Sequence, residues 1–152
     1  MEKVRLGDIA SFSKGKQINV SKLISNGKYD FLNGGINPSG KWNDFNVSEN
    51  SIAISEGGNS CGYVNFMKNK FWCGAHCYYL YDVKLNVKYL YYNLKSNEKK
   101  IQKLRSGACM PNIKKKDLYN FEIWYLRGKS EQEKIVKQLD KVQEIIDLRR
   151  IR

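Results

Sequence analysis

Two glycine-containing segments beside lysines carry residues that could bind a polyanion. Residues 106–113 form a predicted glycine turn that leads into the basic run 114–116, and residues 13–16 form a second basic turn. Lysine presents a compact charge on a flexible stem, which suits contact with phosphate but carries no sequence information. The predicted phosphate contacts are Lys14, Lys16, Lys114, Lys115 and Lys116.

Several loop side chains could instead read base edges, because amides, hydroxyls and imidazole donate and accept hydrogen bonds in defined geometry. Glycines beside them would let the backbone approach a groove closely. For any one of these residues, a hydrogen bond within its own turn is at least as simple a role. The predicted base or groove contacts are Asn33, Gly57, Gly58, Asn59, Ser60, His76 and Asn112.

The net charge of the chain favours a polyanionic partner. The chain has 27 Lys and Arg residues and 15 Asp and Glu residues, which gives a formal charge of +12 over 152 residues. Such a field attracts nucleic acid. A membrane surface is a weaker candidate, because the amphipathic C-terminal segment carries acids as well as bases on its polar face. A basic surface that only aids solubility is the alternative.

The four cysteines, Cys61, Cys73, Cys77 and Cys109, lack the paired Cys-x-x-Cys spacing of a structural zinc site. His76 lies beside Cys77, but we interpret Cys73 and Cys77 as small buried apolar residues. A disulfide framework is not expected in a cytosolic chain of this length. The sequence therefore predicts no metal and no cofactor.

The signatures of an independent enzyme are also absent from the sequence. Asp82 followed by Glu98 and Lys100 superficially resembles a metal-dependent nuclease motif, but we interpret Glu98 as part of a solvated helical face. There is no Gly-x-x-x-x-Gly-Lys-Ser/Thr phosphate loop and no Gly-x-Ser-x-Gly elbow. The Asn-Pro-Pro-aromatic or Asp-Pro-Pro-aromatic element of amino-methyltransferases is missing too. We therefore predict a non-catalytic protein.

Short strands and glycine-rich turns are predicted for most of the chain. Residues 51–55 and 62–66 have the β-branched and aromatic content of strands and are joined by an open glycine loop. Residues 71–72, 77–81 and 121–125 continue the pattern. Several short strands at this spacing favour a curved, mostly antiparallel sheet.

Two amphipathic helices are predicted as well. Apolar residues three and four apart from 87 to 104, after a cap at Asn86, indicate one helix packed on the sheet. Ser130 and Glu133 have the spacing of a capping box, which would start a terminal helix of roughly 22 residues and about 33 Å. The predicted fold class is α+β, with a β-rich recognition domain over residues 1–129 and a coiled-coil-type helix over 130–152.

The terminal helix carries a narrow apolar seam. Ile135, Leu139, Val142 and Ile146 follow one another at spacings of 4, 3 and 4 residues. This spacing favours pairing with another helix. Docking of the same stripe on its own domain is the alternative.

A location in the cytoplasm is expected. No apolar run approaches the roughly 18 residues that a membrane-spanning helix needs. The N-terminal residues also lack the apolar core of a signal peptide.

The order of these motifs resembles the target-recognition domain in the DNA-specificity subunit of type I restriction-modification enzymes. The matching segments are residues 6–9 with Gly15, residues 51–55 followed by Gly58 and Gly62, residues 107–108 with 111–113, and residues 131–136 at the start of a spacer helix. The chain departs from the family at residues 126–129, where prolines are usual. It also has one recognition domain and one helix where the family commonly has two, and so resembles a half-subunit. Either it pairs with itself, or it is a fragment of a longer gene product.

The resemblance implies that this protein reads one half-site in double-stranded DNA without doing chemistry itself. Its implied partners are adenine methyltransferase (modification) subunits, a restriction subunit, and either a second copy in a homodimer or another half-subunit. The implied function of the helix is to set the distance between half-sites.

Two other functions remain open from the sequence alone. One is a stand-alone module for RNA or single strands, with tyrosines stacked on unpaired bases. We instead interpret these tyrosines as core residues with hydroxyls at the edge of the core. The tyrosines concerned are Tyr78, Tyr79, Tyr81, Tyr89, Tyr91 and Tyr92.

The other function is a protein-only adaptor or decoy that binds methyltransferase subunits.

Overall fold

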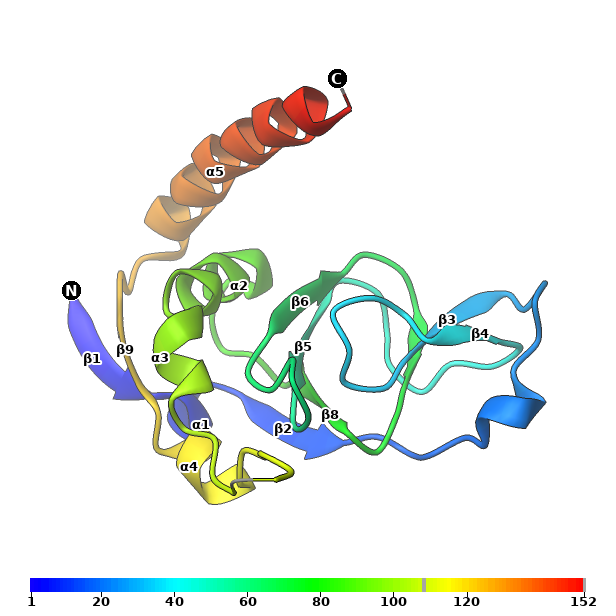
Figure 1. The fold of residues 1–152 in the computed structure, drawn as a ribbon. Coiled ribbons are helices and arrows are strands. Elements are labelled where there is room, and N and C mark those ends of the chain that lie inside the picture. The colour runs from blue at the N-terminus through cyan, green and yellow to red at the C-terminus, as the bar shows by residue number, and fades with distance from the viewer. Residues whose placement is uncertain (108, 152) are drawn as a thin grey trace.

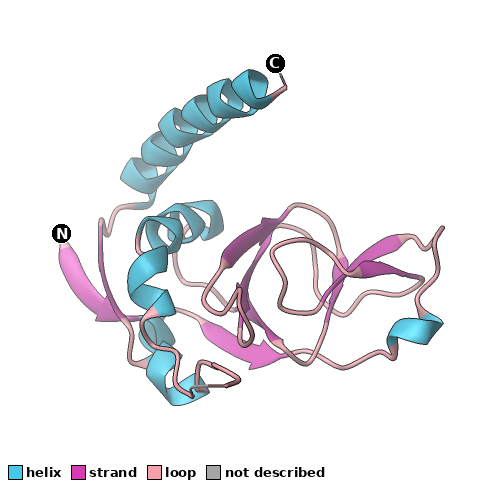
Figure 2. Cartoon of the chain, in the orientation of Figure 1, coloured by secondary structure: helices cyan, strands magenta, loops and turns pink. Residues whose placement is uncertain are grey.

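The computed structural model describes residues 1–107 and 109–151, and shows a mixed α and β domain from which one long helix projects (Figure 1). The predicted α+β class is confirmed, and Figure 2 shows the distribution of helices and strands. The strands are β1 (Glu2–Arg5), β2 (Ser11–Lys14), β3 (Tyr29–Leu32), β4 (Gly40–Trp42), β5 (Ser51–Ser55), β6 (Val64–Met67), β7 (Phe71–Cys73), β8 (Cys77–Tyr81) and β9 (Glu122–Tyr125). The helices are α1 (Leu6–Ile9), the 3-10 turn η1 (Val20–Lys22), α2 (Val87–Ser96), α3 (Glu98–Gln102), α4 (Lys115–Tyr119) and α5 (Lys129–Arg150).

Within the described residues, the strands form three small sheets rather than one. A four-stranded antiparallel sheet has the order β2-β8-β5-β6, and β1 pairs with β9 in a two-stranded antiparallel sheet. The third sheet, β4-β3-β7, contains a parallel pair, β3 with β7. The prediction of mostly antiparallel pairing is therefore confirmed. In Figure 1 the third sheet lies at the end of the domain away from α2 and α5.

Strand β5 lies between two apolar clusters. Ile52 and Ile54 belong to the larger cluster, with Leu90 of α2, whereas Ala53 belongs to a smaller one with Phe71 of β7. Successive side chains of a strand point to opposite faces, so a strand covered on both faces is apolar at every position. This burial explains why residues 52–54 show a continuous apolar run instead of alternation.

The predicted helix over residues 87–104 is two helices. Its cap is confirmed, because the Asn86 side chain accepts a hydrogen bond from the Tyr89 amide at 3.0 Å. The helix breaks at Asn97, whose side-chain amide donates to the Asn93 carbonyl at 2.8 Å. The break redirects the chain so that Ile101 of α3 is fully buried in the core.

The predicted capping box at Ser130 and Glu133 is wrong. Helix α5 begins at Lys129 after Gly128, and no side chain of the described residues caps it. The Gly128 carbonyl already accepts the Gln132 amide at 3.0 Å, which places Ser130 inside the first helical turn. The prediction of a long terminal helix is nevertheless confirmed.

The cysteines within the described residues are free thiols. Cys73 and Cys77 are buried, as predicted, and so is Cys61, whereas Cys109 is exposed. Contact with Cys73 and burial both raise the pKa of the Cys77 thiol. In the same part of the chain, no group of three or more His, Cys, Asp or Glu residues could hold a metal ion.

None of the helices in the described residues is both long enough and apolar enough to cross a membrane.

Tyr78 should contribute to stability in a pH-dependent way. Its hydroxyl donates to the Ile113 carbonyl at 2.8 Å, and burial raises its pKa to about 12. The ordinary value is 10.0, so its stabilising contribution is complete below pH 10 and is lost as the pH rises through 12. We expect Tyr78→Phe to lower the free energy of unfolding by about 1 kcal/mol at neutral pH. In urea titrations, the variant should also lose less stability than wild type between those two pH values.

Candidate nucleic-acid interface

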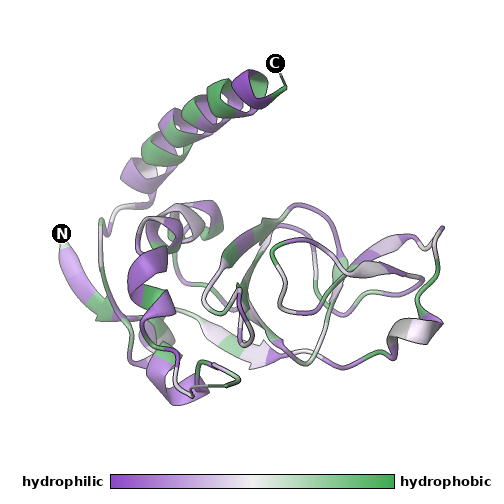
Figure 3. Cartoon of the chain, viewed as in Figure 1, coloured by the Kyte–Doolittle hydropathy of each residue, from purple (hydrophilic) through white to green (hydrophobic). Residues whose placement is uncertain are grey.

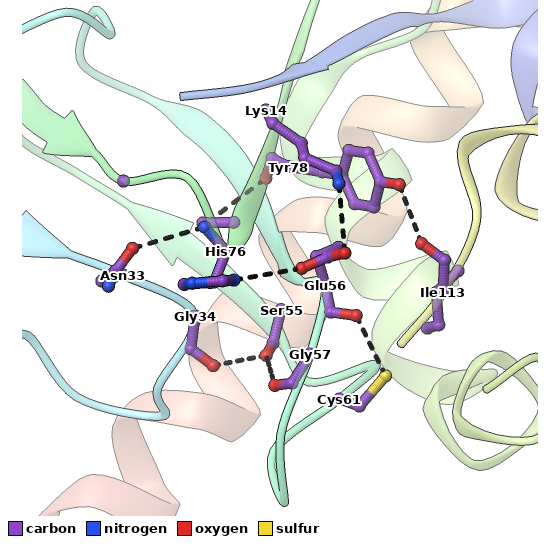
Figure 4. A network of polar contacts seen from close by, with 12 residues as sticks. Lys14, Asn33, Gly34, Ser55, Glu56, Gly57, Cys61, His76, Tyr78 and Ile113 are labelled. Atoms are coloured by element: carbon purple, nitrogen blue, oxygen red, sulfur yellow. Dashed lines mark hydrogen bonds and ion pairs between the residues drawn. The ribbon is translucent and has the colours of Figure 1, made fainter. Parts of the chain in front are cut away.

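A buried carboxylate lies at the centre of the loops that the sequence analysis selected. The Glu56 side chain, at the end of β5, is 7% exposed. Its Oε1 lies 3.1 Å from Lys14 Nζ and its Oε2 lies 3.5 Å from His76 Nδ1 (Figure 4). Its backbone amide donates to the His76 carbonyl at 3.0 Å, and its carbonyl accepts the Ile113 amide at 2.8 Å. Glu56 therefore joins the end of β2, the β7–β8 loop and the segment before α4.

The loop after β3 is held against the same network. Asn33 Oδ1 accepts the His76 amide at 3.3 Å. The Gly34 carbonyl accepts hydrogen bonds from the hydroxyls of Ser55 and Ser60, the latter at 2.6 Å. Gly34 has a φ of +90°, and a Cβ there would lie 2.3 Å from the His76 carbonyl oxygen. Only glycine fits this position, so the approach of the two loops depends on it.

The glycine loop after Glu56 contacts the segment before α4. Gly57 forms an isolated bridge to Asn112, and the Gly58 amide donates to the Pro111 carbonyl at 3.1 Å. Gly58 and Asn59 are exposed, and a Cβ at Gly58 would meet no atom of residues 1–107 or 109–151 within 4 Å. The tip of this loop is therefore open to a partner.

The lysines of β2 and α4 share one surface. Lys14 Nζ lies 5.9 Å from the centroid of the Tyr78 ring, and Lys115 Nζ lies 5.9 Å from that of the Phe12 ring. The two rings pack edge to face with centroids 6.0 Å apart. Two segments about 100 residues apart thus present their charges together.

Lys14 differs from the other lysines predicted to contact phosphate. It is paired with a buried acid, so part of its charge is neutralised before any ligand binds. Lys16 and the run 114–116 are exposed and form no ion pair within residues 1–107 and 109–151. Among the five lysines predicted to contact phosphate, these four therefore carry a charge that no acidic side chain of the described residues neutralises.

The structure brings together most of the residues predicted to contact bases. His76 contacts Glu56, Asn33 accepts a hydrogen bond from the His76 amide, and Asn112 bridges to Gly57, the residue after Glu56. Ser60 is linked to this network because its hydroxyl already donates a hydrogen bond to the Gly34 carbonyl. Asn112 pairs through its backbone with Ser106. Ala108 and Arg152, which belong to sequence motifs noted above, lie outside the described residues.

Sequence reasoning missed Glu56 as the residue at which these segments meet. It is an acid directly after an apolar strand and directly before two glycines, in a strongly basic chain. That context was the available signal. Burial, and after it the charge of Glu56, raise the pKa of the neighbouring Cys61 thiol.

The tyrosines do not form a platform for stacking. Tyr78 and Tyr89 are buried in the described structure, and Tyr91 packs on Phe66 with centroids 5.4 Å apart. Of the six tyrosines considered in the sequence, only Tyr81 is exposed, at 42%. The arrangement is that of a core with hydroxyls at its edge.

The predicted seam on α5 is partly covered and partly open. Ile135 and Leu139 are partly buried, whereas Val142 is 51% exposed and Ile146 is 39% exposed. Figure 3 shows the apolar bands along the helix where it extends beyond the domain.

The whole chain, residues 1–152, matches the family described as the type I restriction modification DNA specificity domain. Two curated proteins described as type I specificity subunits are similar to it. The one from Mycoplasma pneumoniae is 37% identical over 150 residues, which cover 97% of this chain and 39% of that protein. The one from Mycoplasma genitalium is 34% identical over 137 residues, which cover 88% and 36%.

Solved structures share the fold. The crystal structure of a type I restriction-modification S subunit from M. genitalium aligns with a TM-score of 0.87 at 33% identity, covering 94% of this chain and 39% of that one. An HsdS subunit from Thermoanaerobacter tengcongensis aligns with a TM-score of 0.72 at 24% identity, covering 97% and 38%, and shows the fold alone. The chain therefore spans about two fifths of the length of these relatives.

The ion pair of Glu56 yields a prediction about stability. Replacing Lys14 by Met leaves a buried carboxylate without its cationic partner, so we expect the free energy of unfolding to fall by about 1 to 3 kcal/mol. The matched variant Lys16→Met removes the same charge two residues away and should change stability by less than about 0.5 kcal/mol. Urea denaturation measures both. Equal losses in the two variants would contradict a stabilising role for the Lys14–Glu56 contact.

Proposed function

The chain belongs to the type I restriction-modification DNA specificity domain family, and we propose on this basis that it recognises one half of a split site in double-stranded DNA. It supplies sequence choice without chemistry, while separate subunits methylate adenine and cleave the DNA. We expect this action in the cytoplasm, where the protein would meet DNA and its partner subunits.

The observation that carries this proposal is that loops from distant parts of the chain meet at Glu56, beside Lys14 and near Lys115. The loops come from residues far apart in sequence, yet they present glycines, amides and cations on one surface. A duplex offers phosphates on a repeating spacing and base edges in the groove between them. A surface with charges beside open, polar loop tips is complementary to both features.

The lysines and the loops have different tasks in this proposal. Lys16, Lys114, Lys115 and Lys116 contact phosphates, and Lys14 joins them from its place beside Glu56. Within the loops, Asn59 is at the open tip and is the best placed to reach a base edge. The remaining proposed base or groove contacts are Asn33, Gly57, Gly58, Ser60, His76 and Asn112.

Helix α5 supplies the pairing surface in this proposal. The 4-3-4 seam consists of Ile135, Leu139, Val142 and Ile146. Its last two members, Val142 and Ile146, are exposed. Exposed apolar stripes of this kind mark helix pairing. The chain spans about two fifths of the length of its relatives. In this proposal, a second copy or another half-subunit supplies the reader of the second half-site. Methyltransferase and restriction subunits would then assemble on the pair.

The basic run before and within α4 gives a test of DNA binding. Replacing Lys114, Lys115 and Lys116 by Ala should weaken binding to all duplexes alike, because phosphate contacts carry no sequence information. The slope of log affinity against log salt should flatten by as much as roughly 2.7, about 0.9 for each lost phosphate contact. Fluorescence anisotropy with a labelled mixed-sequence duplex measures the slope.

The matched control for this test removes three exposed lysines from α5, at Lys134, Lys137 and Lys141. This control variant loses the same number of positive charges and should keep most of the slope of log affinity against log salt. An equal flattening in both variants would mean that net charge alone, and not phosphate contacts of residues 114–116, causes the change. Tighter binding to a single strand of the same sequence than to the duplex would favour the single-strand alternative.

The seam on α5 gives a test of self-association. Val142→Lys places a charge on the exposed part of the seam and should shift the protein towards monomers in sedimentation velocity, because a desolvated charge opposes helix pairing. Ser130→Lys adds the same charge to an exposed site near the start of α5 and should leave the distribution of species unchanged. Persistence of the wild-type association state in Val142→Lys would remove the seam as the interface.

A further inference from the structure

Gln132 in the first turn of α5 is a polar side chain with no solvent exposure at all. Its Oε1 accepts the Asn86 amide at 2.9 Å, and its Nε2 donates to the Leu126 carbonyl at 2.6 Å. Asn86 caps α2, and Leu126 directly follows β9. One side chain therefore ties the start of α5 to two other elements of the domain.

The contacts around Gln132 close into a ring. Asn86 Oδ1 accepts the Tyr89 amide at 3.0 Å, and the Tyr89 hydroxyl accepts the Leu126 amide at 2.9 Å. Both backbone groups of Leu126 are thus held, one by Tyr89 and one by Gln132. A ring of directional bonds fixes orientation, which apolar contacts alone do not.

A second contact holds α5 further along the helix. Asp140 lies 2.8 Å from Lys88 Nζ and accepts a hydrogen bond from the Tyr92 hydroxyl, and both partners belong to α2. Burial acts to raise the pKa of Asp140, but the hydrogen bonds from Lys88 and Tyr92 outweigh it, so the pKa lies below its ordinary value. The ionised form of Asp140 is therefore the one that the fold holds.

The two contacts lie on one face of α5. Gln132, Val136 and Asp140 are successively four residues apart, and Gln132 and Asp140 are about 12 Å apart along the axis at ~1.5 Å per residue. A helix held at one point can pivot about it. A helix held at two separated points on one face has a set direction and a set rotation about its own axis.

The face held by these contacts borders the apolar seam. At ~100° per residue, Val142 and Ile146 lie about 80° and 40° around the helix from Gln132, and about 160° and 120° from Asp140. The contacts with α2 therefore leave the open part of the seam uncovered and decide which way it faces.

We propose that Gln132 and Asp140 are positioning residues that set the direction and rotation of α5 relative to the DNA-recognition surface. Gln132 fixes the position of the start of α5, and Asp140 fixes the direction of its axis. If α5 pairs as proposed above, these residues also determine the distance between two half-sites. That consequence rests on the proposed function, whereas the direction of the helix does not.

The direction of α5 can be measured without DNA by double electron–electron resonance. Spin labels at Ser39→Cys and Lys141→Cys report the position of α5 against the β3–β4 turn, and both sites are exposed. The background carries Cys109→Ser, since Cys61, Cys73 and Cys77 are buried from the reagent. Dilution with unlabelled protein removes distances between copies.

We expect one narrow distance distribution for the parent protein. Gln132→Met keeps the side-chain length but removes the donor and the acceptor, and should shift and broaden the distribution. The control Gln138→Met alters an exposed glutamine of the same helix and should leave it unchanged. A narrow, unshifted distribution in Gln132→Met would overturn the proposal.

A second variant decides the matter if Gln132→Met does not fold by circular dichroism. Asp140→Asn removes the attraction to Lys88 at a half-exposed site, so the fold should survive. A broadened distribution supports the second holding point, and an unchanged one overturns it.

The consequence for DNA needs the recognised motif, which methyladenine mapping after co-expression with a methyltransferase subunit would provide. Duplexes with the half-sites at the mapped spacing, or one base pair closer or further apart, then serve as probes. Gln132→Met should bind an isolated half-site like wild type but discriminate less between spacings. If the wild-type protein binds no duplex, the proposed function fails, while the distance measurements still decide the positioning role.

Discussion

The arrangement of the loops around Glu56 depends on burying one carboxylate in a protein of net charge +12. Removing a carboxylate from water is costly, and the cost is offset only if cations and hydrogen bonds are held close to it. Glu56 meets this requirement by drawing Lys14 and His76 from two other segments to within 3.1 and 3.5 Å. The contacts that satisfy this charge therefore hold the loops together, while Gly58 and Asn59 at the tip of one loop stay exposed.

The scaffold beneath the loops explains how such a charge can be tolerated. Strand β5 is covered on both faces and leads directly into Glu56. The packing of β5 therefore holds the backbone of Glu56 in place. Tyr78 of β8 and Ile113 close the network on the side of α4. Rigid strands that end in irregular loops are a common basis for recognition, because the loop sequence can change while the strands keep the loops in place.

The sequence predicted those elements whose cause is local, and failed where the cause lies far along the chain. Strand β5 follows from its apolar run, and the cap of α2 follows from Asn86 beside residues that it bonds directly. The break at Asn97 was missed because it serves the burial of Ile101 in a core assembled from the whole domain. The central role of Glu56 was missed for the same reason, since its lysine partner is 42 residues away. The start of α5 was misplaced because a local capping pattern competed with contacts of Gln132 to a residue 46 positions earlier.

Buried polar side chains are few in the described structure, and their positions are informative. Ser55, Glu56 and Gln132 are the buried polar residues in that part of the chain, and no buried side-chain nitrogen or oxygen there lacks a hydrogen-bond partner. Apolar packing can hold elements together but tolerates small rotations and shifts, whereas hydrogen bonds have preferred directions. Two of these residues lie where loops meet, and the third lies where a long helix leaves the domain. The directional bonds are thus concentrated at the two places where the proposed function would depend on orientation: the surface proposed to read DNA and the helix proposed to set its distance from a second reader.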